Sequence, residues 1–151
     1  MKIIVVSDNH GRSDWIPNVM KRHRDADYFI HCGDIELHPS EVFGFICVRG
    51  NNDYYDYPEF RVLNLGKHNI FITHGHRMML FKDRSILVNK AKEYGCNIVC
   101  FGHTHVFEYQ ILDGVHLINP GSIRYNRDFS RPCYAILEIQ GDDIRVRRVE
   151  Y

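Results

Sequence analysis

The feature that most constrains this chain is a pattern used five times, in which a short apolar run ends and hydrophilic residues follow at once. The runs lie at residues 2–7, 28–32, 45–49, 69–73 and 97–101 and are rich in β-branched or aromatic residues. Apolar runs without polar alternation are typical of strands covered on both faces. In an open α/β sheet the carboxyl ends of such strands share one rim, so the hydrophilic residues can converge there.

Helices are expected between several of these strands. The first begins at Ser13 or Asp14, and its apolar face has a helical period formed by Ile16, Val19, Met20 and His23. A second helix is predicted over residues 83–94. Residues 36–43 have room for about two helical turns, which suits a short crossover between parallel strands.

The later part of the chain changes to a period of two, which indicates strands with one exposed face. Residues 106–119 and 133–149 each contain two such strands around a turn with glycine, and residues 61–73 indicate an earlier hairpin. We therefore predict a single domain over residues 1–151 with an α/β fold, in which two mixed sheets pack together and helices flank them.

The composition disfavours several classes of partner. Lys and Arg number 19 and Asp and Glu number 19, so we expect no strong nucleic-acid binding through a cationic surface. No run approaches the roughly 18 apolar residues of a membrane span, and the first run is too short for a secretory signal. The 5 cysteines form no CxxC pair, which favours buried reduced thiols and a cytoplasmic location.

The residues that follow the five runs are of the kinds that bind divalent metal ions. Carboxylate and imidazole groups without thiolates favour manganese, iron, nickel or zinc over a structural thiolate site. Two ions about 3.5–4 Å apart can stabilise the attacking and leaving oxygens of an in-line displacement and generate hydroxide from water near neutral pH. Each motif alone also fits an ordinary turn, but five in order, each after a strand, favour a metal centre.

The five motifs resemble, in order, those of the calcineurin-like metallophosphoesterase superfamily: Asp8-x-His10, Gly33-Asp34, Gly50-Asn51-x-Asp53, Thr73-His74-Gly75-His76 and Gly102-His103-Thr104-His105. The resemblance spans residues 3 to about 122. The small size and the segment Asn119-Pro120-Gly121-Ser122 resemble the compact YfcE-like phosphodiesterase branch in particular.

The resemblance implies a four-layer αββα sandwich and two divalent metal ions per chain. The implied ligands form two sets joined by one shared carboxylate, namely Asp8, His10 and His105; Asn51, His74 and His103; and Asp34 between them. Members of this branch hydrolyse phosphodiesters with manganese or nickel, and several are dimers or larger. A small phosphodiester substrate and a homodimer or higher homo-oligomer are therefore expected.

One departure from the superfamily bears on the chemistry. Many members have a histidine directly after the ligand asparagine, thought to protonate the leaving group, and Asn52 stands there in this chain. An amide cannot act as a general acid, so substrates with good leaving groups, such as aryl phosphodiesters, are expected. The YfcE-like branch also lacks this histidine. His76 is another candidate proton donor, and it fits the role of a supporting or surface histidine equally well.

Three further side chains are candidates for contact with the substrate. Asn9 could donate a hydrogen bond to a phosphate oxygen, and Arg77 or Arg124 could pair with its charge. Residues 124–131 carry arginines and aromatics that would suit an anionic substrate with a ring, although they also fit a solvated loop. The remaining histidines are expected to be structural: His23, His31, His38, His68 and His116.

Two other functions fit parts of this pattern. A protein-interaction scaffold, like the related retromer subunit of the vacuolar-sorting machinery, keeps the fold with a degraded motif set, whereas this chain has all the implied ligands. A nuclease like the double-strand-break repair members is disfavoured by the neutral charge. The sequence therefore favours a phosphodiesterase that works by attack of metal-activated water, with Asp34, Asn51, Asn52 and His76 at its catalytic positions.

Overall fold

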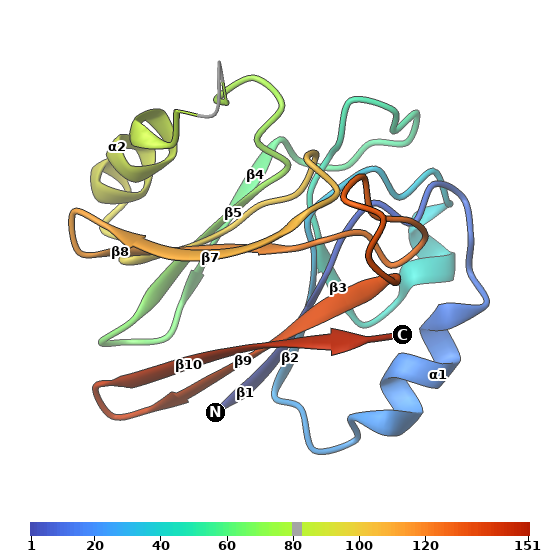
Figure 1. Ribbon diagram of the computed structural model, residues 1–151, viewed down its shortest axis with the longest axis horizontal. Coiled ribbons are helices and arrows are strands. Elements are labelled where there is room, and N and C mark those ends of the chain that lie inside the picture. Colours follow the sequence, from blue (N-terminus) through green and yellow to red (C-terminus); the bar gives the residue numbers. More distant parts are fainter. Residues whose placement is uncertain (80–82) are drawn as a thin grey trace.

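The computed structural model describes residues 1–79 and 83–151 and contains two five-stranded sheets packed face to face (Figure 1). Sheet A is formed by β1 (Lys2–Val6), β2 (Tyr28–His31), β3 (Phe45–Cys47), β9 (Cys133–Gln140) and β10 (Asp143–Glu150). Sheet B is formed by β4 (Phe60–Asn64), β5 (Asn69–Thr73), β6 (Ile98–Cys100), β7 (Phe107–Leu112) and β8 (Val115–Pro120).

Both sheets are mixed, as predicted. Sheet A has the order β10-β9-β1-β2-β3, in which β1, β2 and β3 run parallel, while β9 is antiparallel to both of its neighbours, β1 and β10. Sheet B has the order β4-β5-β6-β8-β7, in which β5, β6 and β8 run parallel and the edge strands β4 and β7 are antiparallel. The predicted hairpins over residues 61–73, 106–119 and 133–149 are confirmed.

The helices cover the two outer faces. Helix α1 (Trp15–Arg22) packs against sheet A through Trp15, Ile16 and Val19, and α2 (Ser85–Glu93) packs against sheet B through Leu87, Val88 and Ala91 (Figure 1). Between the sheets lies a third apolar cluster that includes Ile3, Val5, Ile30, Ile70, Ile72 and Ile98. These layers confirm the predicted α/β sandwich of two sheets flanked by helices.

Local predictions failed at two places. Residues 36–43 do not form two helical turns but one 3-10 turn, η1 (Pro39–Val42), because Pro39 starts it and Gly44, with φ of 94°, reverses the chain directly after it. Asp14 stands at the start of α1 without a side-chain cap, since its carboxylate pairs with the Arg12 guanidinium at 2.6 Å.

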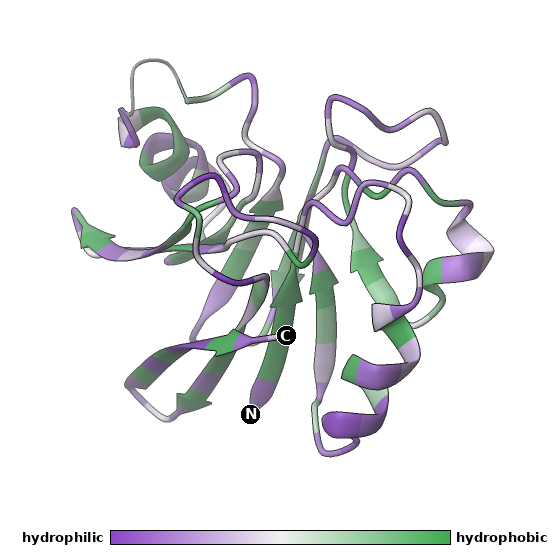
Figure 2. Ribbon diagram, turned by 45° about the vertical axis from the view of Figure 1, so that its right-hand side comes forward, coloured by the Kyte–Doolittle hydropathy of each residue, from purple (hydrophilic) through white to green (hydrophobic). Residues whose placement is uncertain are grey.

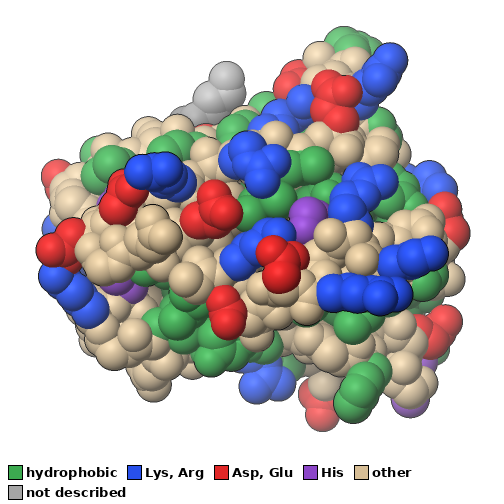
Figure 3. All heavy atoms as spheres, turned by 90° about the horizontal axis from the view of Figure 1, so that it is seen from below, with side chains coloured by type: hydrophobic (Ala, Val, Ile, Leu, Met, Phe, Trp, Pro, Cys, Tyr) green, Lys and Arg blue, Asp and Glu red, His purple; other side chains and the backbone are tan. Residues whose placement is uncertain are grey.

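The surface and the cysteines agree with the composition. All 5 cysteines are free and buried. Within the described residues, no helix is long and apolar enough to cross a membrane. On the face seen from below, basic and acidic side chains are interspersed (Figure 3).

Candidate metal centre

The hydrophilic segments after five strands meet at one rim of the sandwich. In sheet A, β1, β2 and β3 lead to Asp8, Asp34 and Asn51, and in sheet B, β5 and β6 lead to His74 and His103. Because these strands run parallel to their neighbours, their carboxyl ends lie on the same side. Figure 2 shows the hydrophobic strands giving way to hydrophilic loops at this end.

Hydrogen bonds join these loops within and between the sheets. In sheet A the N–H of Asp8 donates to the carbonyl of Gly33 at 3.0 Å. Between the sheets the N–H of His103 donates to the Asp8 carboxylate at 3.2 Å, and Nδ1 of His74 contacts the Cys32 carbonyl at 2.7 Å. These hydrogen bonds therefore connect the loops of both sheets at the rim.

Four of the predicted ligands form a tight cluster, with one ligand atom from each lying within 4.8 Å of the others: Asp8, His10, Asp34 and His105. Nε2 of His105 lies 3.1 Å from Oδ1 of Asp8 and 3.1 Å from Nε2 of His10. Nε2 of His10 lies 3.8 Å from Oδ2 of Asp34. This cluster is a candidate metal-binding group with the same members as the first predicted ligand set and its shared carboxylate.

The other three predicted ligands are grouped around His74, which also lies close to Asp34. Nε2 of His74 is 3.1 Å from Oδ1 of Asn51 and 3.5 Å from Oδ1 of Asp34. The rings of His74 and His103 have centroids 5.2 Å apart. The structure thus brings all seven side chains to this rim, while their roles as ligands stay a prediction.

Oxygen acceptors orient three of these imidazoles through Nδ1. The acceptors are the Glu36 carboxylate, the Cys32 carbonyl and the Tyr125 carbonyl, at 2.7, 2.7 and 3.3 Å from His10, His74 and His105 respectively. An oxygen acceptor at Nδ1 assigns the proton to that nitrogen and leaves the lone pair on Nε2. Contacts of this kind are typical of histidines that bind metals through Nε2.

Ligand-type atoms therefore converge in the first cluster. With the imidazole protons assigned to Nδ1, the Nε2 atoms of His10 and His105 face each other as acceptors, and Oδ1 of Asp8 faces the second of them. Among the described residues, this buried carboxylate oxygen has no hydrogen-bond partner. An unpaired buried oxygen is costly, and a cation among these atoms would remove that cost. The carboxylate and imidazole donors fit a divalent ion of the borderline group.

Backbone strain is concentrated in the same residues. Five of the seven predicted ligands have positive φ, namely Asp8 (57°), His10 (44°), Asp34 (53°), His103 (69°) and His105 (56°). For residues other than glycine this conformation costs on the order of 1 kcal/mol each, and such strain clusters at functional sites. The surrounding hydrogen bonds must therefore hold these side chains in place.

The environment of Asp34 keeps it ionised. Burial alone would raise its pKa, but the neighbouring His74 and the hydrogen bonds from Asn52 outweigh burial and hold the pKa of Asp34 well below its usual value. Asn52 donates its backbone N–H to one carboxylate oxygen at 2.9 Å and its Nδ2 to the other at 2.7 Å. In this structure Asn52 thus orients the carboxylate that lies between the two ligand groups.

Asp53 explains the last position of the third motif. Its Oδ1 accepts the backbone N–H groups of Ile35 and Glu36 at 2.7 Å each, and its Oδ2 accepts that of Gly50 at 2.7 Å. The buried carboxylate therefore ties the loop after β2 to the loop after β3.

Two glycines stand where the loops leave no room for a side chain. A Cβ at Gly50 would collide with the backbone and carboxylate of Asp34, and one at Gly102 would collide with the Ser7 hydroxyl. Neither position has a positive φ, so close approach, and not backbone conformation, requires glycine there.

We expect Gly50→Ala to lower the free energy of unfolding by about 2–3 kcal/mol, because the new methyl group must displace Asp34. Gly114→Ala is the matched control, since its surroundings are open but its φ is 77°, so it reports backbone strain alone. Gly114→Ala should lower the free energy of unfolding by about 1 kcal/mol. Urea denaturation of both variants would contradict this account if Gly50→Ala were the more stable.

A sequence profile of the Calcineurin-like phosphoesterase superfamily domain matches residues 1–142. The chain belongs to this superfamily. The probable metallophosphoesterase YsnB of Bacillus subtilis is 36% identical over 152 residues, which cover 97% of this chain and 89% of YsnB. The predicted resemblance to the calcineurin-like phosphoesterases is therefore confirmed.

Solved structures agree with this assignment. A Streptococcus pneumoniae protein described as a predicted phosphoesterase has a TM-score of 0.92 at 34% identity, over 99% of this chain and 88% of that chain. A novel archaeal phosphodiesterase has a TM-score of 0.71 at 26% identity, over 99% and 100% of the two chains. Vps29 of Chaetomium thermophilum, with a TM-score of 0.78 at 18% identity over 98% and 96%, shows the shared fold alone.

Within this calcineurin-like site, the Asn9 side chain is buried and makes hydrogen bonds to its surroundings. Its Nδ2 donates to the carbonyls of Arg12 and Ile35 at 2.7 and 2.9 Å, and its Oδ1 contacts Nε2 of His31 at 2.9 Å. The residue is 0% exposed. These contacts fix the Asn9 side chain to the segments that carry Arg12, Ile35 and His31, and its contact with a substrate stays a prediction.

The two candidate arginines lie on the surface near the rim. Nη1 of Arg124 donates to the carbonyl of His10 at 2.7 Å, so this side chain supports a ligand loop. Nη1 of Arg77 lies 3.7 Å from the Glu59 carboxylate, which offsets its charge. Their contact with a substrate stays a prediction.

His76 adjoins the second ligand group. Its ring centroid is 5.5 Å from that of His74 and 6.1 Å from that of His103. Its Nδ1 is buried without a hydrogen-bond partner among the described residues. The side chain is therefore placed beside two of the predicted metal ligands.

His31 is buried beneath the rim and is neutral. Its Nε2 contacts the Asn9 carbonyl oxygen at 2.9 Å, and its Nδ1 accepts the N–H of Gly33 at 3.2 Å. Burial lowers the pKa of His31 to about 3, and a proton on Nδ1 would also face the Gly33 donor. This agrees with the structural role expected for it.

We expect the His31 imidazole to make folding sensitive to acid. Unfolded histidine binds a proton below about pH 6.5, whereas the folded state resists it down to about pH 3, so stability falls as the pH drops through that window. Between these limits the parent should lose up to about 5 kcal/mol of its free energy of unfolding relative to His31→Gln, whose amide can make both hydrogen bonds. Urea denaturation from pH 4 to 8 would contradict this if the two proteins changed in parallel.

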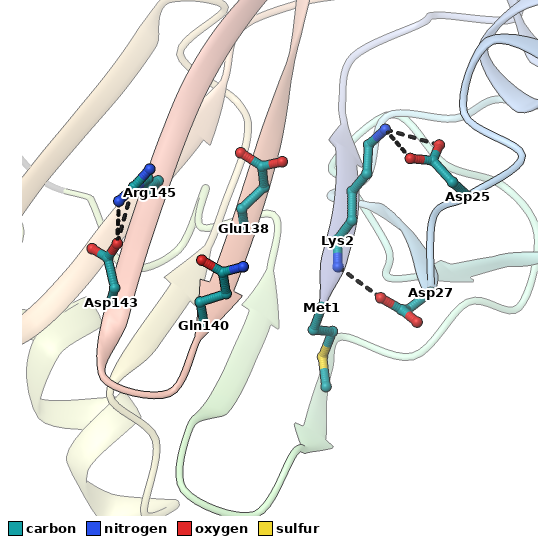
Figure 4. Close-up of a pocket in the computed structure, with 8 residues that line it drawn as sticks. All are labelled: Met1, Lys2, Asp25, Asp27, Glu138, Gln140, Asp143 and Arg145. Carbon is teal, nitrogen blue, oxygen red and sulfur yellow. Dashed lines mark hydrogen bonds and ion pairs between the residues drawn. The ribbon is translucent and has the colours of Figure 1, made fainter.

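A hollow of about 450 Å³ lies around the start of β1, at the end of sheet A opposite the predicted ligands (Figure 4). Its charged groups are largely paired with one another, since Lys2 binds Asp25 at 2.9 Å and Arg145 binds Asp143 at 2.7 Å. None of the predicted ligands lines it. Size alone therefore does not mark the functional site in this superfamily member.

Proposed function

We propose that this chain is a metal-dependent phosphodiesterase that uses two divalent ions, with manganese the first choice and nickel, iron or zinc as alternatives. The observation that carries the proposal is the convergence of Asp8, His10, Asp34 and His105, which each place one ligand atom within 4.8 Å of the others. Membership of the calcineurin-like superfamily and the archaeal phosphodiesterase of similar fold support the same activity.

The residues of the proposed site either hold a metal ion or orient a residue that does. One ion would be held by Asp8, His10 and His105, the other by Asn51, His74 and His103, with Asp34 shared. When bound, such ions act as Lewis acids towards phosphate oxygens and lower the pKa of a coordinated water to about 7. Glu36 and Asn52 orient His10 and Asp34, so the ligand atoms are in position before substrate arrives.

The proposed substrate is a small phosphodiester with a good leaving group. Asn52 occupies the position after the ligand asparagine and cannot donate a proton from an acid group. An aryl oxide leaves without needing full protonation, so aryl diesters suit this site best. For poorer leaving groups His76 is the candidate donor, since its ring adjoins His74 and His103. The 5 buried free thiols support a cytoplasmic location.

The direct test is an assay of the protein on bis(4-nitrophenyl) phosphate and on 4-nitrophenyl phosphate with manganese, nickel, iron and zinc in turn. We expect hydrolysis with at least one metal, loss of activity with a chelator, and a higher kcat/KM for the diester. Inactivity with all four metals on both substrates would replace the enzyme with the scaffold alternative. The Vps29 fold similarity gives that alternative its support.

A further inference from the structure

A hollow of about 150 Å³ opens beside His76 at the carboxyl end of β5. Its walls come from the start of β4, the end of β5 and the turn that follows β5, and include Phe60, Thr73, Gly75, His76 and Met78. Neither the motifs nor the family membership assigns this hollow a role.

The walls are largely apolar and well supported. The Phe60 ring stacks on Phe71, with centroids 5.4 Å apart, and also contacts the Tyr94 ring at 4.9 Å. The buried Thr73 already uses its hydroxyl, which donates to the Glu59 carbonyl at 3.5 Å. A ligand group that enters here thus meets mainly hydrocarbon, held in position by the outer face of sheet B.

The charges at the mouth of the hollow offset one another. Arg77 and Glu59 both line it, and Nη1 of the arginine lies 3.7 Å from the glutamate carboxylate. An additional anionic group would be repelled by Glu59 as well as attracted by Arg77, so its net electrostatic attraction would be small. The hollow therefore suits an uncharged group.

His76 links this hollow to the candidate metal centre. It lines the hollow, and its ring also lies 5.5 and 6.1 Å from the rings of His74 and His103. Gly75, the residue after the ligand His74, lines it too. A phosphate at the second ligand group therefore has the hollow within reach of an attached ester group.

We propose that this hollow is the pocket for one ester group of the substrate and that it selects an uncharged aromatic ring. A cavity of about 150 Å³ with apolar walls is large enough to hold one benzene ring. The inference rests on the proposed phosphodiesterase activity and narrows its substrates to diesters with at least one compact ring. Met78 and Phe60 are the residues that set this preference.

The test compares two phosphonates of equal charge, phenylphosphonate and methylphosphonate, on the manganese-loaded protein. Their dissociation constants are measured by titration calorimetry, and their inhibition constants against bis(4-nitrophenyl) phosphate are measured in parallel. We expect phenylphosphonate to bind about tenfold more tightly, because its ring leaves water for the hollow. Met78→Trp, which fills the hollow, should reduce this ratio to about one and leave methylphosphonate affinity unchanged.

Two further variants separate the pocket from general damage. Met78→Leu conserves the volume and should keep the parent ratio, whereas Phe60→Ala removes one wall and should lower the ratio at least threefold. If Met78→Trp does not fold, Phe60→Ala still decides. Equal affinity for both phosphonates in the parent, or an unchanged ratio in the folded Met78→Trp or Phe60→Ala proteins, overturns the assignment.

Failure of the pocket and failure of the activity give different results. A protein that hydrolyses bis(4-nitrophenyl) phosphate but does not distinguish the two phosphonates keeps its proposed function and loses the pocket. A protein that hydrolyses no diester but binds phenylphosphonate more tightly, in a manner abolished by Met78→Trp, keeps the pocket and loses the function.

Discussion

Asp34→Ala is expected to lower kcat/KM for bis(4-nitrophenyl) phosphate by more than about a hundredfold. Removing a hydrogen-bond partner of a metal ligand typically costs about 10–100-fold, and the loss of a shared ligand should exceed that. Asp34 lies between the two groups, 3.5 Å from Nε2 of His74 and 3.8 Å from Nε2 of His10. Its removal therefore affects both groups at once.

Two other variants should lower kcat/KM less than Asp34→Ala does. His103→Ala removes a ligand of one group only, and Asn52→Ala removes a side-chain donor to Asp34 while leaving the carboxylate, so Asn52→Ala should lose no more than about a hundredfold. Asp142 lies in the exposed turn between β9 and β10, so Asp142→Ala should have the kcat/KM of the parent. Steady-state kinetics and bound manganese per chain are the measurements. Parent-like activity in Asp34→Ala would show that this carboxylate is no ligand.

The position of the site was predictable because it depends on strand ends. Apolar runs such as residues 2–7 and 28–32 identify their own strands, and parallel pairing then places whatever follows them at one rim of their sheet. Asp8 follows β1 of sheet A and His105 follows β6 of sheet B, so their convergence across 97 positions of the chain also depends on how the two sheets pack, which only the resemblance of the motifs implied. The same logic extends to Asn51 and His74.

The contacts that support the ligands were not predictable in this way. Glu36 reaches His10 only because the chain after Asp34 turns with positive φ at Glu36 (53°), and no sequence period encodes such a turn. The contacts of Asn9 were not predictable for a related reason, since its side chain binds a backbone carbonyl and a buried imidazole from other segments. The conformations of loop residues depend on tertiary contacts, which the sequence periods of strands and helices do not predict.

Asp8→Asn is expected to stabilise the metal-free protein by about 1–2 kcal/mol while abolishing its stabilisation by manganese. In the parent, one oxygen of Asp8 accepts the N–H of His103, and the other lies 3.1 Å from Nε2 of His105, which offers no donor when the ring proton is assigned to Nδ1. An asparagine can keep the first contact and donate its amide N–H to His105. A buried unpaired acceptor is thereby replaced by a hydrogen bond, which is worth about that amount.

The consequence is an inversion of stability between two conditions, which a general loss of packing cannot produce. Without metal, Asp8→Asn should melt roughly 3–6 °C above the parent for a domain of this size. With manganese at about 100 times its dissociation constant, the parent gains about 2.7 kcal/mol and should melt above the variant, because the variant lacks a charged ligand. Thermal melts with and without chelator measure both. A variant that melts below the parent in both conditions would mean that the aspartate is needed for the fold itself, and the strain at this rim would then require another explanation than metal binding.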